Sequence, residues 1–131
     1  MEDKIFNSWL AGFWEGEGSL YKLTKQTGYG VNIHQAIDNE KTVRFCMDKI
    51  KEKFGGHLNK KAPRILKHKI QLRWQLYKRE DIIYFLKTIY PYCKIRKKQI
   101  EDVLEYYEIH PKRINQYAKY TQNISTDTYN R

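Results

Sequence analysis

The sequence predicts an α+β fold, in which helices cover one face of a four-stranded antiparallel sheet and leave the other face open. The expected elements follow one another as a helix, two strands, a helix, two strands and further helices. The last strand alternates strictly between apolar and polar residues, which is typical of a strand with one buried face. Its apolar set is Ile70, Leu72, Trp74 and Leu76, and its polar set is Lys69, Gln71, Arg73, Gln75 and Tyr77. Antiparallel sheets commonly pack helices against only one face.

The first helix is expected from about residue 7 to residue 16. Asn7 or Ser8 can cap its start, because a short polar side chain accepts a hydrogen bond from a free backbone N–H. Its apolar faces come from Leu10, Phe13 and Trp14. A turn signal at residues 26–28 then separates two expected strands, at residues 19–25 and 29–38.

The second half of the chain supplies the remaining elements. A helix is expected over residues 40–54, where apolar residues recur at helical spacing until Gly55-Gly56 ends it. A short strand at residues 57–61 is broken by Pro63, and the alternating strand at 69–77 follows. Two further helices are expected, at about 80–90 before Pro91 and at about 96–109 before Pro111. The length fits a single domain over residues 1–131, with a flexible polar tail at about 125–131.

Charge and cysteine content narrow the class of protein. The 131 residues carry a formal net charge of +10, which favours a polyanionic partner such as nucleic acid or an acidic membrane surface. Cys46 and Cys93 lie far apart without the spacing of a zinc site, so both are expected as core residues in a reducing compartment. No apolar run approaches ~20 residues and no signal-peptide pattern opens the chain, so we expect a soluble intracellular protein. An organelle and a prokaryotic cytoplasm fit equally.

The open sheet face has the composition of a nucleic-acid-binding surface. Between residues 51 and 79 ten Lys or Arg residues accompany a single acid, Glu52, whereas solvated faces usually mix both signs. Arg, Asn and Gln can make bidentate hydrogen bonds with base edges in the major groove, and Lys can neutralise phosphates. The residues expected on this face are Asn32, His34, His57, Asn59, Lys61, Lys69, Gln71, Arg73 and Gln75. Ser19, Tyr21 and Lys25 of the first strand are expected to contact the nucleic acid, DNA or RNA, together with them.

The segment from residue 8 to residue 19 carries the most specific signal. Ser8, Gly12 and Gly16 recur every four residues, so they form a stripe of small residues along which another backbone can approach closely. Glu15 and Glu17 lie at the C-terminal end of the helix, where the helix dipole disfavours negative charge. A nearby Lys or Arg, or a divalent metal, would compensate them. If the stripe packs against its own copy about a two-fold axis, two Glu17 carboxylates meet in a place suited to metal-assisted phosphodiester hydrolysis.

Residues 10–19, Leu-Ala-Gly-Phe-Trp-Glu-Gly-Glu-Gly-Ser, resemble the LAGLIDADG motif of homing endonucleases. The element order over residues 8 to about 105 is similar too, so the resemblance implies the family's αββαββα fold, whose sheet is half of a DNA-binding saddle. It implies that Glu17 and the Gly16 carbonyl bind Mg²⁺ (or another divalent cation such as Mn²⁺), and that Glu15 is structural. With one motif in the chain, it implies a homodimer whose interface includes Ser8, Leu10, Ala11, Gly12, Trp14, Glu15 and Gly16.

Two positions depart from the family's usual pattern. The polar residue that positions water after the second strand is either Asp38 or Asn39 here. The family's active-site lysine falls on Arg96, with Lys97 and Lys94 beside it. Arg can stabilise a charged phosphate but cannot act as a base, because it does not lose its proton. The catalytic residues implied by the resemblance are therefore Glu17, Asp38, Asn39, Arg96 and Lys97.

The resemblance implies a site-specific endonuclease that makes a staggered cut in a long, near-palindromic duplex and promotes the mobility of an intron or intein. The alternative is a catalytically inactive relative of the same fold, either an RNA-binding intron maturase or a DNA-binding regulator. A basic structural protein, such as a ribosomal or membrane-surface domain, would need neither the small-residue stripe nor Glu17.

Overall fold

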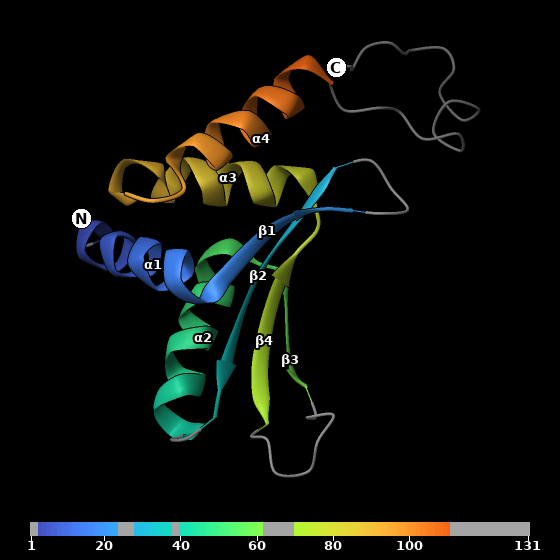
Figure 1. Ribbon diagram of the computed structural model, residues 1–131. Coiled ribbons are helices and arrows are strands. Elements are labelled where there is room, and N and C mark those ends of the chain that lie inside the picture. The colour runs from blue at the N-terminus through green and yellow to red at the C-terminus, as the bar shows by residue number, and fades with distance from the viewer. Residues whose placement is uncertain (1–2, 24–27, 38–39, 62–69, 111–131) are drawn as a thin grey trace.

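The computed structural model describes residues 3–23, 28–37, 40–61 and 70–110. It confirms the expected order of elements (Figure 1), which is α1 (Asp3–Glu17), β1 (Gly18–Lys22), β2 (Tyr29–Ala36), α2 (Glu40–Phe54), β3 (His57–Lys61), β4 (Gln71–Leu76), α3 (Arg79–Ile89), the 3-10 turn η1 (Tyr90–Tyr92) and α4 (Lys97–Ile109). Predictions made for Lys25, Asp38, Asn39, Lys69 and residues 125–131 fall outside the described residues.

The four strands form one antiparallel sheet in the order β1-β2-β4-β3. Figure 1 shows α1, α2 and α3 on one side of this sheet, with α4 packed on α3. Apolar residues of the strands, including Ile33, Leu72 and Trp74, are fully buried beneath these helices. The sheet therefore has one covered and one uncovered face, which confirms the α+β fold class that the alternation predicts.

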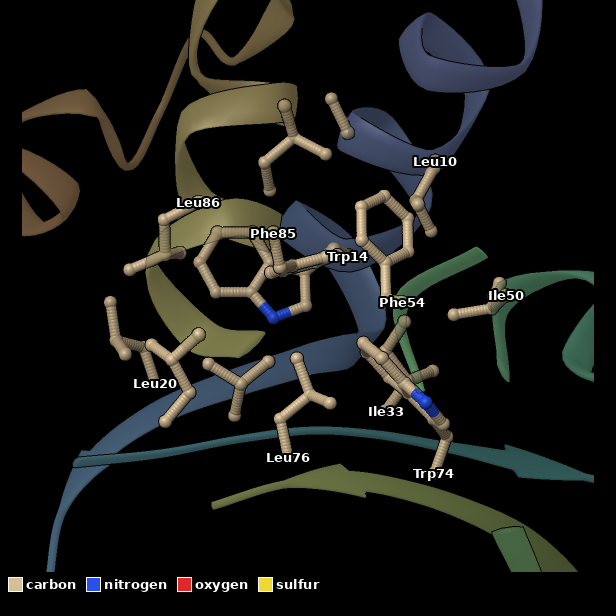
Figure 2. Close-up of a cluster of buried hydrophobic side chains, with 14 of the residues drawn as sticks. Leu10, Trp14, Leu20, Ile33, Ile50, Phe54, Trp74, Leu76, Phe85 and Leu86 are labelled. Carbon is tan, nitrogen blue, oxygen red and sulfur yellow. The ribbon is translucent and has the colours of Figure 1, made fainter. Parts of the chain in front are cut away.

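Aromatic side chains fill the space between the helices and the sheet. Figure 2 shows Trp14 of α1, Phe54 of α2, Phe85 of α3 and Trp74 of β4 gathered in one cluster. The rings of Trp14 and Phe85 meet edge to face at 5.8 Å between centroids, and those of Trp74 and Phe85 at 5.2 Å. The indole N–H of Trp74 donates to the carbonyl of Gly55 at 2.8 Å, so the turn that ends α2 is fixed to the core.

The start of α1 differs from the prediction. The helix begins at Asp3, so Asn7 and Ser8 lie inside it, and the expected cap at either residue is wrong. Ile5 and Phe6 continue the apolar pattern toward the N-terminus, so they extend the helix by another turn. The side-chain oxygen of Asn7 instead accepts a hydrogen bond from Lys53 Nζ at 3.0 Å, which ties α1 to α2.

The end of the first strand also moved. β1 ends at Lys22, and the Leu23 N–H donates to the Gly28 carbonyl at 3.0 Å. Helix α3 ends at Ile89, before Pro91 as predicted, and Pro91 lies in the short turn η1, where its missing N–H costs no hydrogen bond. No helix in the described part of the chain is long and apolar enough to cross a membrane.

Candidate functional site

The uncovered face of the sheet brings most of the predicted polar residues into three cross-strand rows. One row follows the pairs Ser19–Asn32, Asn32–Gln75 and Gln75–His57, and it crosses all four strands. A second row joins His34, Arg73 and Asn59, and a third joins Ala36, Gln71 and Lys61. The register therefore places these side chains on one surface.

His34 lies at the centre of this face, opposite Arg73 and close to the charge of Lys61. Partial burial lowers the pKa of His34 below its usual value, and the positive charges of Lys61 and Arg73 lower it further. His34 Nε2 and Arg73 Nε are buried without a hydrogen-bond partner in the described structure. Buried polar atoms usually have a hydrogen-bond partner, so the described part of this face is left with two unsatisfied polar atoms.

The depressed pKa of His34 predicts a stability that falls in mild acid. The unfolded chain binds a proton at His34 near pH ~6.5, whereas the folded chain resists it, so stability declines as pH drops through and below that value. His34→Gln should therefore lose less stability between pH 7.5 and 5.5 than the unchanged protein does. Urea unfolding at both pH values measures this, with His57→Gln on the exposed edge strand as the control. Equal losses in wild type and His34→Gln would contradict it.

Glu15 is held inside its own chain by the segment that leads into α4. Its carboxylate accepts hydrogen bonds from the backbone N–H groups of Lys94 at 2.9 Å, Ile95 at 2.6 Å and Arg96 at 2.8 Å. Burial alone would raise the pKa of Glu15, but these three hydrogen bonds outweigh it and hold the pKa below its usual value. The compensating positive charge is thus a set of backbone N–H groups, and neither a Lys or Arg side chain nor a metal is needed at Glu15.

Glu17 has a different environment, although it lies only two residues further on. It is the last residue of α1, it is exposed, and it directly precedes β1, whose Ser19 opens the four-strand row. Within the described residues, no group of three His, Cys, Asp or Glu side chains lies close enough to hold a metal. Gly16, also exposed, lies beside Glu17.

Arg96 is fixed against the junction of α1 and β1. Its guanidinium donates to the carbonyl of Gly18, the residue after Glu17, at 2.9 Å, and lies 4.8 Å from the ring centroid of Trp14. Arg96 is thus more ordered than a solvated residue at a helix start. Lys97 points elsewhere, with its Nζ 4.5 Å from the centroid of the Tyr90 ring, and Lys94 is exposed. Of these three cations, the contacts place Arg96 beside the residue that follows Glu17.

Gln99 makes a contact that the sequence did not predict. Its side-chain amide donates to the carbonyl of Leu20 at 3.0 Å, next to the Arg96 contact with Gly18. β1 is an edge strand, so these two carbonyls have no neighbouring strand to pair with. Arg96 and Gln99 satisfy them, and the start of α4 is thereby locked to the strand that follows Glu17.

The predicted dimer interface needs a correction. Leu10, Ala11 and Trp14 are fully buried in the core of a single chain, so these side chains cannot face a partner. The Glu15 side chain is also engaged within its own chain. The opposite side of α1 is open: a Cβ added at Gly12 or Gly16 would meet no atom within 4 Å.

The open side of α1 also exposes large apolar residues that the sequence reading missed. Ile5 is 82% exposed and Trp9 is 40% exposed, and both lie on the side of the helix that carries Gly12 and Gly16. A groove between α1 and α2 continues this apolar surface to Phe45, which is 62% exposed. Trp9 lies three residues and Ile5 seven residues before Gly12, and this helical spacing is the signal that places both on the side of the glycine stripe.

No family model matches the chain, and no curated protein matches it by sequence. Comparison with solved structures gives the class: the chain has the fold of the LAGLIDADG homing endonucleases. The homing endonuclease I-CvuI, in complex with the I-CreI target in the presence of Mg, matches with a TM-score of 0.66 and 18% identity, covering 82% of this chain and 68% of that one. I-CvuI with its own target in the presence of Ca gives a TM-score of 0.67 at the same identity and coverage.

A third structure matches over a smaller share of its length. The LAGLIDADG meganuclease I-AabMI bound to uncleaved DNA gives a TM-score of 0.59 and 15% identity, covering 86% of this chain and 40% of that one. At these identities the likeness concerns the fold. It confirms the fold that the motif at residues 10–19 implied.

Proposed function

We propose that the protein is a site-specific, metal-dependent endonuclease of double-stranded DNA that acts as a symmetric homodimer. The observation that carries this proposal is the position of Glu17. This exposed carboxylate directly precedes β1, and the row of Ser19, Asn32, Gln75 and His57 starts two residues later. A carboxylate that can hold a metal ion, placed at the border of a basic, amide-rich surface, suits cleavage of a nucleic acid bound to that surface.

The sheet face would bind the duplex through its major groove. Asn32, Gln75 and Gln71 can recognise base edges, while Lys61 and Arg73 can also neutralise phosphates. A twisted antiparallel sheet is a known groove-reading element. The proteins with the same fold that are described above are DNA complexes, which supports this assignment.

The open side of α1 would form the dimer interface. Gly12 and Gly16 leave room for a second helix, and Ile5 and Trp9 supply apolar surface that a second copy would cover. A two-fold axis along this surface brings the two copies of Glu17 together and joins the two sheets into one long saddle. A symmetric saddle implies a near-palindromic target site. Ser8, the first residue of the small-residue stripe, would lie at the edge of the interface.

The residues beside the axis suit a hard divalent cation, Mg²⁺ or Mn²⁺. Glu17 and the Gly16 carbonyl offer oxygen ligands, and the second protomer would double the set that one chain provides. When bound, such a metal activates water and stabilises the leaving oxygen of the phosphodiester. Arg96 holds a fixed positive charge beside Gly18, where it would stabilise the phosphate without accepting a proton. Asp38 or Asn39 would orient water, and Lys97 would add positive charge nearby.

A staggered cut in such a site would favour the spread of the intron or intein that encodes the enzyme. One observation favours the second candidate, a maturase or regulator without cleavage. The Arg96 guanidinium is already engaged with the Gly18 carbonyl and the Trp14 ring, so it has less freedom to reach a phosphate.

Binding measurements separate these functions from a structural role. We expect tighter binding of a duplex DNA pool than of a folded RNA of equal length. The logarithm of the binding constant should also fall steeply with the logarithm of salt concentration, by roughly 0.9 for each phosphate neutralised. Preference for the folded RNA would favour the maturase, and a flat salt dependence would contradict a basic DNA-binding face.

A further inference from the structure

The backbone of Glu17 is held on both sides by one segment of the chain, the residues that lead into α4. Two positions before Glu17, the carboxylate of Glu15 accepts hydrogen bonds from the backbone N–H groups of residues 94–96, at 2.6–3.1 Å. One position after Glu17, the carbonyl of Gly18 accepts a hydrogen bond from the Arg96 guanidinium at 2.9 Å. The short arc that contains Glu17 therefore cannot shift relative to the start of α4 without breaking one of these contacts.

Arg96 is held at Gly18 by a second contact, with an aromatic ring. Its guanidinium lies 4.8 Å from the ring centroid of Trp14, a fully buried side chain. Trp14 in turn packs against Gly18: a Cβ added at Gly18 would lie 2.6 Å from Trp14 Nε1 and 2.7 Å from the carbonyl oxygen of Asn32. These distances leave no room for a side chain, so the glycine lets β1 start between the indole and β2. The guanidinium, the indole and the start of β1 therefore form one packed unit.

The junction between α1 and β1 is supported from the side of α4. Gln99, in the first turn of α4, donates to the carbonyl of Leu20 at 3.0 Å, so it fixes β1 beyond the junction. On the open side of α1, a Cβ added at Gly16 would meet no atom within 4 Å. Of the two side chains that bond β1 from the start of α4, Arg96 is the one whose acceptor lies next to Glu17.

We propose that Arg96 is a positioning residue, which fixes the backbone of Glu17 so that its exposed carboxylate is preorganised for a divalent cation. The inference rests on the proposed metal-dependent function and gives Arg96 a role besides its charge. A carboxylate at the C-terminal end of a helix loses conformational freedom when it binds a cation, and a fixed backbone reduces that cost. Groups that orient a metal ligand typically contribute about 10–100-fold to metal affinity.

The positioning role and the charge of Arg96 predict opposite effects on cation binding. Arg96→Met keeps a long side chain but removes both the hydrogen bond to Gly18 and the charge. Loss of the charge alone would tighten cation binding, because a guanidinium repels a nearby cation. Loss of positioning should weaken it, and we expect the Mn²⁺ dissociation constant to rise about tenfold or more. Electron paramagnetic resonance of free Mn²⁺ during a titration of the protein measures this constant, and only the binding that disappears in Glu17→Gln is counted.

Arg96→Lys is a second variant that decides the question even if Arg96→Met does not fold. It keeps the positive charge but loses the planar guanidinium that contacts the Gly18 carbonyl and the Trp14 ring together. A role through charge alone predicts an unchanged Mn²⁺ dissociation constant, whereas positioning predicts a rise. The Mn²⁺ concentration that gives half of the maximal cleavage rate should rise in the same variants.

Gln99→Met is the matched control, because it also removes a side-chain donor that bonds a β1 carbonyl from the start of α4. It should change the Mn²⁺ dissociation constant much less than the Arg96 variants do. An unchanged or lower constant in both Arg96 variants would overturn the inference, and so would an equal rise in Gln99→Met. A wild-type protein without any Mn²⁺ binding that depends on Glu17 would instead refute the proposed metal-dependent function, and the inference with it. Thermal melting of each variant shows whether it is folded.

Discussion

Glu17→Gln should abolish DNA cleavage, with a rate at least about a thousandfold lower, while duplex binding stays intact. Gln has nearly the same shape as Glu but no charge, so it removes the carboxylate that would hold the cation. In a symmetric dimer the substitution removes both copies at once, which is why the loss should reach or exceed the upper range for a single electrostatic contact at an active site. Binding should stay equal or tighten, because a carboxylate beside the DNA repels phosphates. Cleavage of a duplex and filter binding in Ca²⁺ measure the two effects separately.

Glu15→Gln is the matched control, because it makes the same chemical change two residues away. Here we expect lower stability of the folded chain, by about 1–3 kcal/mol, since the carboxylate accepts three backbone N–H groups. The lowered pKa of Glu15 adds a pH signature: its stabilisation is present above the usual carboxyl pKa and is lost as pH falls through the folded value. Glu15→Gln should therefore lose less stability in acid than wild type does. If Glu15→Gln and Glu17→Gln had the same effects, the two roles assigned here would be wrong.

Gly12→Leu should convert the protein into a folded monomer. A Cβ at Gly12 meets nothing within 4 Å in one chain, so a larger side chain does not disturb the fold. It would nevertheless hold two α1 helices apart, and we expect the dimer dissociation constant to rise at least about a hundredfold, which corresponds to about 3 kcal/mol of lost packing. Affinity for a near-palindromic duplex should fall too, because one protomer offers only half of the saddle. Sedimentation equilibrium and circular dichroism measure assembly and fold.

Two further variants separate this effect from ordinary destabilisation. Gly12→Ala should stabilise the folded chain by about 0.5–1 kcal/mol through helix propensity while weakening the dimer only slightly. Leu10→Ala, on the buried side of the same helix, should cost about 2–5 kcal/mol of folding stability. A wild-type protein that remains monomeric at high concentration, or a Gly12→Leu variant that fails to fold, would contradict the interface.

The open sheet face could be predicted because strand residues alternate between faces. Once Leu72, Trp74 and Leu76 are assigned to the core, Gln71, Arg73 and Gln75 must point the other way, and the neighbouring strands follow the same rule. Glu17 and Glu15 could be separated only through a resemblance to a known motif. The hydrogen bonds that hold Glu15 come from residues 94–96, about eighty positions along the chain.

The two faces of α1 could not be told apart from the sequence. Leu10, Trp14 and Trp9 are all large apolar residues, and both a core and a partner protein bury such side chains. Packing against α3 and the sheet decided that Trp14 is inside and Trp9 outside. The position of the Tyr21 ring depends in the same way on strand register and on the space above Gly30, which composition does not reveal.

The most direct measurement is sequencing of the ends produced when the protein meets a randomised duplex library in Mg²⁺. We expect discrete staggered cuts at one near-palindromic site, which disappear when EDTA removes the metal and when Glu17→Gln replaces the wild-type protein. Recovery of bound but uncut DNA, both with Mg²⁺ and with Mn²⁺, would contradict the proposed endonuclease activity. The protein would then be a nucleic-acid-binding protein of the same fold.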